Sequence, residues 1–143
     1  MSLTKHLELQ TQTVVHLVEL LERERVALAQ AKIEGKRLSE LTASKQAALF
    51  KLEQLEAIRA GAQLKLGYGA GRKGALKAAQ DADCVAAWKR LQGLALRAKA
   101  LNVANGETVS LRMTYNQRIL SFLNGVVGSK LYGPDGRAQR DGA

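Results

Sequence analysis

Apolar residues recur at steps of three or four along most of this chain, and that spacing constrains its fold more than any other feature. Near the N-terminus, apolar residues recur every seven positions at Leu7, Val14, Leu21 and Leu28, with Leu3 and Leu17 on the interleaved positions. A second series runs through Cys84, Trp88, Leu91, Ala95, Ala98, Asn102, Asn105, Val109, Arg112, Asn116, Ile119, Leu123 and Val126. Side chains spaced in this way share one face of an α-helix. The sequence therefore predicts an all-α fold, an elongated antiparallel helical bundle of three main helices.

The composition favours the same fold. Only 4% of the 143 residues are aromatic, there is one proline, and the strong helix formers Ala, Leu, Lys, Glu, Gln and Arg dominate. The length suits a single helical domain over residues 1–143.

The N-terminal part of the chain is predicted to form a helical hairpin over residues 3–60. Its first helix covers residues 3 to about 32 and its second about 37–59, with Gly35 between them. A segment containing five glycines follows at residues 61–74, and we expect a mobile linker there.

The C-terminal part is predicted to hold one long helix over about residues 76–130. Gly106 costs about 1 kcal/mol relative to Ala, which does not end a well-packed helix. The alternative is a break at Asn105-Gly106, because Asn-Gly is also a turn signal. Pro134 stops any helix, and residues 131–143 are expected to form a mobile tail.

Residue types that carry chemistry are few. His6 and His16 are ten residues apart and are expected at the surface, and the single Cys84 shares a helical stripe with Trp88, so we expect a buried thiol. Neither histidine has a Ser, Cys or Asp partner in a recognisable pattern. We therefore expect no enzyme activity, no metal site and no cofactor. The charged run Glu22–Arg25 is expected on a solvated face.

The net charge of +9 is carried by the second half of the chain. Residues 1–60 hold nine Lys or Arg against eight Asp or Glu, whereas residues 61–143 hold 13 against five. Such a surface attracts nucleic acid, anionic lipid or an acidic protein. Because aromatic residues do not accompany the basic ones, nucleic acid is not the expected partner. A basic helical nucleic-acid or anionic-surface binder stays an alternative, as does a structural coiled-coil protein.

The N-terminal residues lack the pattern of a secretory signal, and no run reaches the roughly 18 apolar residues of a membrane span. A cytoplasmic protein without membrane insertion is expected, and its oligomeric state stays open.

The stretch from Leu101 to Gly125 is unusual because its expected inward face starts polar, at Asn102 and Asn105. Buried amides require hydrogen-bond partners. We expect these two to fix the register of the helix, while the more apolar half beyond Gly106 is available to a partner.

Three segments resemble the FlgN family of flagellar type III export chaperones. The first is Leu41–Leu52, with Ser44-Lys45 ahead of an apolar run. The second is Ala87-Trp88 through Leu101-Asn102-x-x-Asn105-Gly106, and the third is Asn116-Gln117 with Leu131-Tyr132-Gly133-x-Asp135-Gly136. The resemblance covers nearly the whole chain, and the two glycine-containing motifs are its most specific parts.

The resemblance implies a chaperone that binds the hook-associated proteins FlgK and FlgL and presents them to the export gate protein FlhA. It implies a substrate-binding face made of Asn102, Asn105, Val109, Met113, Asn116, Ile119, Leu120 and Leu123. It also implies that Leu131, Tyr132 and Gly133 dock to the export gate, with Tyr132 as the main contact. Plain intramolecular core is the alternative for the apolar part of that face, and a tail aromatic folded back on the bundle is the alternative for Tyr132.

Overall fold

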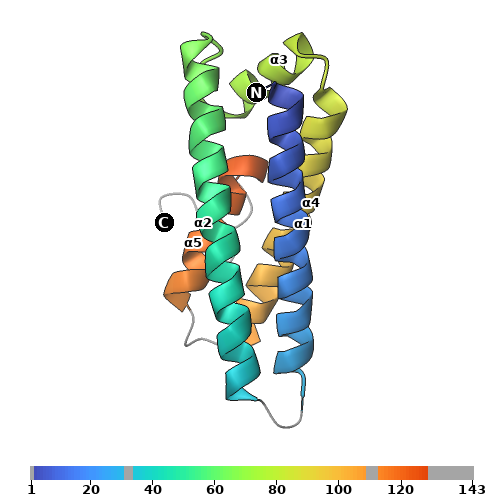
Figure 1. The fold of residues 1–143 in the computed structure, drawn as a ribbon, viewed down its shortest axis with the longest axis vertical. Helices are drawn as coiled ribbons and strands as arrows, with labels where there is room; N and C mark the ends of the chain where they lie inside the picture. The colour runs from blue at the N-terminus through green and yellow to red at the C-terminus, as the bar shows by residue number, and fades with distance from the viewer. Residues whose placement is uncertain (1, 31–33, 109–112, 129–143) are drawn as a thin grey trace, which may run out of the picture.

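The computed structural model describes residues 2–30, 34–108 and 113–128, with the backbone alone for residues 113–117. In these residues the structure is all-helical. Its helices are α1 (Leu3–Leu28), α2 (Gly35–Lys65), α3 (Gly71–Asp81), α4 (Val85–Thr108) and α5 (Met113–Val127). The helices α1, α2 and α4 lie side by side along the long axis, α3 crosses one end, and α5 lies behind α2 (Figure 1).

The heptad positions of α1 form the centre of the bundle. Leu7, Val14, Leu17 and Leu21 are all buried, and α1 packs against both α2 and α4. The helix begins at Ser2, whose side-chain oxygen accepts a hydrogen bond from the Lys5 N–H at 3.2 Å. The prediction of an amphipathic first helix is confirmed, although the helix ends at Leu28 and not near residue 32.

Only residues 66–70 of the glycine-rich segment form a turn, so the prediction of a linker over the whole of residues 61–74 is wrong. Helix α2 continues through Gly61 to Lys65, and α3 starts at Gly71. The end of α2 is closed by two bonds, from the Gly67 N–H to the Leu64 carbonyl and from the Tyr68 N–H to the Gln63 carbonyl. This closure needs a left-handed residue, and Gly67 has a φ of 86°.

The turn from α3 to α4 uses the same hydrogen-bond pattern with a different residue. Asp83 occupies the left-handed position with a φ of 53°. Its N–H donates to the Gln80 carbonyl, and the Cys84 N–H donates to the Ala79 carbonyl at 2.8 Å. Cys84 then packs into the core, which confirms the prediction of a buried thiol.

The long C-terminal helix over about residues 76–130 is the largest error of the sequence-based prediction. The segment contains three helices, and the chain reverses between Thr108 and Met113 so that α5 packs back against α4 (Figure 1). The series of three- and four-residue steps continues across this reversal, because both helices turn their apolar faces toward one core. Spacing alone did not reveal the change of direction. The bundle therefore has more than the three main helices that the sequence predicted.

Candidate functional site

The two asparagines of the candidate face lie inside the bundle. Asn102 and Asn105 are both buried on α4. The amide nitrogen of Asn105 donates to the Leu21 carbonyl at 2.9 Å and to the Glu24 carboxylate at 3.0 Å. Asn105 thus ties α4 to α1, as expected for a residue that fixes helix register.

The same carboxylate forms an ion pair inside the bundle. Lys45 Nζ lies 2.8 Å from Glu24 Oε2, and the side chains are only 1% and 2% exposed. The expectation that Glu24 lies on a solvated face is therefore wrong. Together, Glu24, Lys45 and Asn105 connect α1, α2 and α4 through polar contacts in a region surrounded by apolar side chains.

The apolar part of the candidate face is also buried. Ile119, Leu120 and Leu123 of α5 all lie in the interior, and Ile119 and Leu123 belong to the main core with Leu7 and Trp88. The expectation that this half is available to a partner does not hold for this conformation. For a partner to reach these side chains, α5 must move away from α4.

The C-terminal end of α5 is held by long polar side chains of the neighbouring helices. Arg72 donates to the Val127 carbonyl at 3.3 Å, Gln92 to the Val126 carbonyl at 3.5 Å, and Lys99 to the Gly128 carbonyl at 3.5 Å. The last carbonyls of a helix have no partner within the helix, and cations nearby complement its dipole. These contacts fix the C-terminal end of α5 against α3 and α4.

Several predicted site residues lie outside the described part of the chain. Val109, Leu131, Tyr132 and Gly133 are in segments that the structure does not describe, and the side chains of Met113 and Asn116 are not described either. The predicted substrate-binding residues whose side chains the structure describes are all buried, namely Asn102, Asn105, Ile119, Leu120 and Leu123.

An apolar groove at the other end of the bundle was not predicted from the sequence. It has a volume of about 350 Å³ and is lined by α1, α2, α3 and α4. Its floor includes the buried Leu7, Ala75 and Trp88, and its rim includes Ile58 and Leu66, which are 60% and 73% exposed. We call it the α1–α3 groove. The sequence places Ile58 on the apolar stripe of α2. It does not predict that Ile58 is exposed, because that depends on where the neighbouring helices end.

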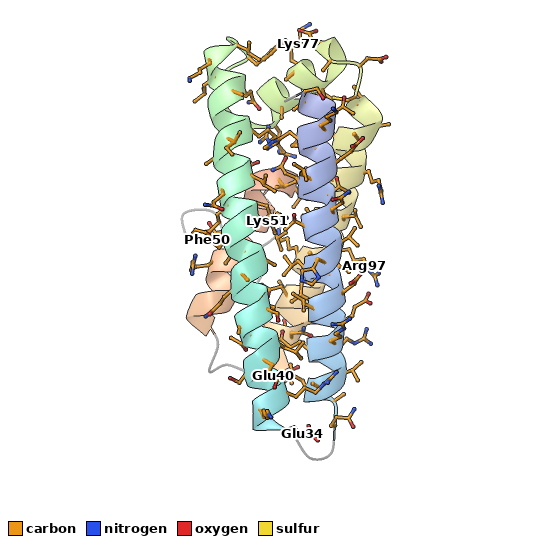
Figure 2. The ribbon with its side chains drawn as sticks, in the orientation of Figure 1. Glu34, Glu40, Phe50, Lys51, Lys77 and Arg97 are labelled. Carbon is orange, nitrogen blue, oxygen red and sulfur yellow. The ribbon has the colours of Figure 1, made fainter. Side chains whose placement is uncertain are left out.

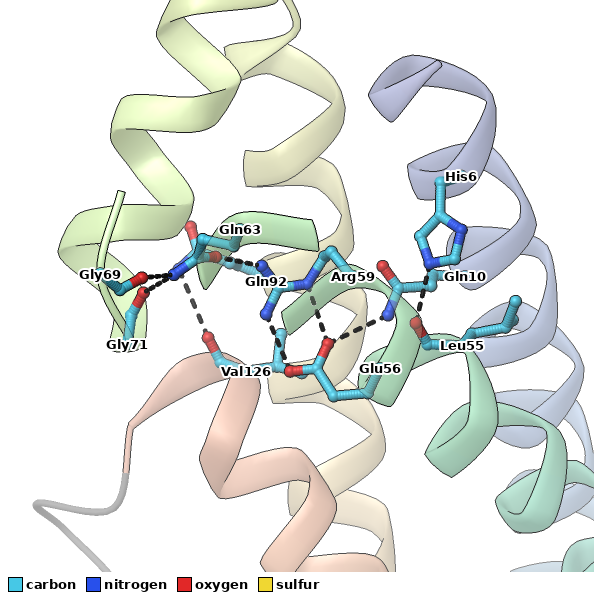
Figure 3. A network of polar contacts seen from close by, with 10 residues as sticks. All are labelled: His6, Gln10, Leu55, Glu56, Arg59, Gln63, Gly69, Gly71, Gln92 and Val126. Atoms are coloured by element: carbon cyan, nitrogen blue, oxygen red, sulfur yellow. Dashed lines mark hydrogen bonds and ion pairs between the residues drawn. The ribbon is translucent and has the colours of Figure 1, made fainter. Parts of the chain in front are cut away.

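A polar network runs beside this groove (Figure 3). His6 Nε2 donates to the Leu55 carbonyl at 2.8 Å, so the expectation of a surface histidine is wrong for His6. Arg59 contacts both carboxylate oxygens of Glu56 and donates to Gln63 Oε1 at 2.7 Å. The Gln63 amide nitrogen then donates to the Gly69 and Gly71 carbonyls of the turn. These hydrogen bonds pair the polar groups of Arg59, Glu56 and Gln63 with one another, so the surface of the groove is mainly apolar.

The Arg59 guanidinium also lies over the Trp88 ring, 5.1 Å from its centroid. A cation over an indole face is attracted by the ring quadrupole. Arg59 therefore connects the polar network to the floor of the groove.

Within the described residues, no group of three or more His, Cys, Asp and Glu side chains is placed to hold a metal ion. Among the helices of the described segments, none is both long enough and apolar enough to cross a membrane.

Comparison with curated proteins and with solved structures gives no match. Comparison with family models does. The FlgN protein family matches residues 1–140, nearly the whole chain, in agreement with the motifs at Leu101–Gly106 and Leu131–Gly136. The all-helical structure, with its buried asparagines on α4, agrees with this match. The chain therefore belongs to the FlgN family of flagellar export chaperones.

Proposed function

We propose that this protein is a cytoplasmic export chaperone that binds the hook-associated proteins FlgK and FlgL and delivers them to the export gate protein FlhA. The family match over residues 1–140 carries the proposal. No catalytic step is needed for this role, since the chaperone acts by covering apolar surface that would otherwise self-associate.

The proposed cargo-binding element is α5 with its apolar face. Helix α5 has 15 residues, and isolated helices of about 12–15 residues are marginal in water. Its stability therefore depends on the surface that covers Ile119, Leu120 and Leu123. An amphipathic cargo segment can cover these side chains in place of α4.

Apart from its apolar face, α5 is held by the contacts of Arg72, Gln92 and Lys99 at its C-terminal end, which are 3.3–3.5 Å long, and by an exposed ion pair. The side-chain contact between Arg118 of α5 and Glu53 of α2 is 2.9 Å long but solvent-exposed, and such pairs contribute about 0–1 kcal/mol. Cargo binding by this route separates α5 from α4 before new apolar contacts form. The free energy needed for this separation lowers the net affinity for cargo and favours release at the export gate.

The test compares two adjacent positions of α5 in pull-downs with purified FlgK and FlgL. Leu120→Asp places a charge on the buried face, whereas Ser121→Asp places the same charge on the exposed face. We expect Leu120→Asp to abolish co-purification and Ser121→Asp to retain it, with circular dichroism showing that both variants stay helical.

Other outcomes would redirect the proposal. Stronger binding by Leu120→Asp would place the cargo on α4 beneath α5 and contradict the assignment to the α5 face. Failure of the unmodified protein to bind either FlgK or FlgL would contradict the cargo itself.

The proposed gate-docking residues are Leu131, Tyr132 and Gly133, which lie beyond the described part of the chain. Tyr132→Ala is expected to retain cargo binding and to weaken binding to the cytoplasmic part of FlhA. Equal loss of both would show that the residue stabilises the chaperone and does not contact the gate.

A further inference from the structure

The α1–α3 groove exposes apolar side chains at its rim, above a floor that belongs to the core of the bundle. Ile58 and Leu66 are 60% and 73% exposed at its rim, while Trp88 and Leu7 close its floor. Contiguous exposed apolar surface at a concave site marks an interaction surface in a folded protein. The lining comes from α1–α4, so this surface is distinct from the α5 face proposed for cargo.

The shape of the groove matches a helix. The lining residues Ile58 and Ala62 of α2 and Leu66, directly after its last residue, recur every four positions. On α1, Leu3 and Leu7 do the same. Rows at four-residue spacing form the ridges against which another helix packs. A third helix lying between the two antiparallel rows would cover the cavity and both exposed rim residues. A small ligand would fill the cavity but leave Ile58 and Leu66 in water.

The charge around the groove selects the kind of helix. The segment of residues 57–80, which forms the end of α2, the turn and most of α3, contains five basic residues and no Asp or Glu. These are Arg59, Lys65, Arg72, Lys73 and Lys77. Glu56 precedes the segment and pairs with Arg59 at 2.8 Å, and Asp81 follows it and pairs with Lys77 at 3.4 Å. The net positive charge of the segment is therefore carried by Lys65, Arg72 and Lys73. The positive field at this end of the bundle favours carboxylates on an approaching partner.

We propose that the α1–α3 groove is a docking site for an acidic amphipathic helix of a partner protein. The partner places leucine-sized side chains over Trp88 and between Ile58 and Leu3. Its carboxylates face the basic segment of residues 57–80. This inference does not depend on the cargo assignment to α5, because it uses different residues and a different partner chemistry.

The experiment uses the full chain and Trp88, which is the only tryptophan in the sequence and lines the groove. The probe is a synthetic 18-residue peptide without tryptophan, with leucines at steps of three and four and glutamates on its other face. One control peptide carries lysines in place of the glutamates. A second control peptide has the same residues as the acidic peptide in an order that disperses the leucines. Binding is measured by the fluorescence of Trp88 and, independently, by calorimetry.

We expect the acidic amphipathic peptide to bind and to change the Trp88 emission. The lysine peptide and the dispersed peptide are expected to bind at least about tenfold more weakly, because one loses the charge complementarity and the other the apolar face. Raising the salt concentration should weaken binding of the acidic peptide, since exposed charges are screened. Equal binding of the acidic and lysine peptides, or no binding of the acidic peptide at millimolar concentration, would overturn the proposal.

Two variants of α2 locate the binding surface. Ile58→Glu alters the groove, and Phe50→Glu makes the same change at a position with the same 60% exposure that does not line the groove (Figure 2). We expect Ile58→Glu to weaken binding of the acidic peptide about tenfold or more, and Phe50→Glu to change its affinity less than about twofold. Similar effects of both would show general attraction to the chain and overturn the assignment. Leu66→Glu, at a 73% exposed position, repeats the test at the other end of the rim.

Discussion

Lys45 Nζ of α2 lies 2.8 Å from Glu24 Oε2 of α1, and both side chains are almost completely excluded from solvent. The Asn105 amide of α4 donates to the other oxygen of the same carboxylate at 3.0 Å. A charge at this depth is stable only if it is paired and hydrogen-bonded. The three residues therefore connect α1, α2 and α4 at one level of the bundle.

Lys45→Met should be strongly destabilising, because it removes the cation that lies 2.8 Å from the buried Glu24 carboxylate. We expect a loss of about 3–5 kcal/mol in the free energy of unfolding, measured by urea denaturation. The double variant Glu24→Leu/Lys45→Met should recover most of this loss, since no buried charge remains. Lys77→Met is the control, because its pair with Asp81 is exposed and should contribute at most about 1 kcal/mol. A small effect of Lys45→Met, comparable to the control, would contradict the interpretation.

Asn105→Ala removes two buried hydrogen bonds while leaving the ion pair in place. We expect the free energy of unfolding to fall by about 1–3 kcal/mol, because the Leu21 carbonyl and the Glu24 carboxylate each lose a donor. Thr108→Ala serves as the control. Its hydroxyl bonds to the Ala104 carbonyl of its own helix at an exposed position, so it connects no helices. Equal effects of the two changes would show that Asn105 is not a connecting residue.

Gly74→Ala should destabilise the start of α3. A Cβ at this position would lie 2.6 Å from three atoms, namely the Gln63 amide nitrogen and the carbonyl oxygens of Tyr68 and Gly69. Two of these are backbone atoms of the turn, so relief requires the turn to shift, at a cost of about 1–3 kcal/mol.

The matched change is Gly93→Ala in α4, where a Cβ meets nothing within 4 Å. It should raise the free energy of unfolding by up to about 1 kcal/mol, because alanine favours the helix more than glycine does. Thermal unfolding of the two variants should therefore move in opposite directions. Shifts of the same sign would contradict the packing at Gly74.

The pH dependence of stability should carry a contribution from Lys99. Burial lowers the pKa of its ammonium group below the ordinary value for lysine. Between the lowered value and the ordinary value of about 10.4, the unfolded chain holds a proton that the folded protein has lost. Stability from this group therefore increases as the pH rises through that window. Lys99→Met should remove this increase in denaturation series at several pH values, whereas Lys77→Met at an exposed site should leave it unchanged.

Most of the helical content could be predicted from the sequence, since the positions of Leu7, Val14 and Leu21 require one buried face and the structure buries it. The direction of the chain could not. Asn102, Asn105, Ile119 and Leu123 follow one unbroken spacing, and that spacing is the same whether the helix continues or reverses and packs on itself. The resemblance identified the family correctly, but it did not indicate that Leu120 is buried in this conformation.

The polar residues show the limits of pattern reasoning more clearly. The local sequence of Glu24 is typical of a solvated face, with Arg23 and Arg25 beside it. Its partner Lys45 is 21 positions away, and only the antiparallel packing of α1 on α2 brings the two together. The α1–α3 groove could not be predicted from the sequence either, because it forms only where the ends of four helices meet.

The contact among Glu24, Lys45 and Asn105 also restricts how related sequences can differ. Replacing one charged member removes a close counter-charge from a buried group, which is worse than keeping the pair or losing both members. A lineage that replaced Lys45 with an apolar residue would pass through an unstable intermediate unless position 24 changed nearly at once. Relatives that share this bundle should therefore show correlated changes at positions 24 and 45, with position 105 following the carboxylate that it contacts.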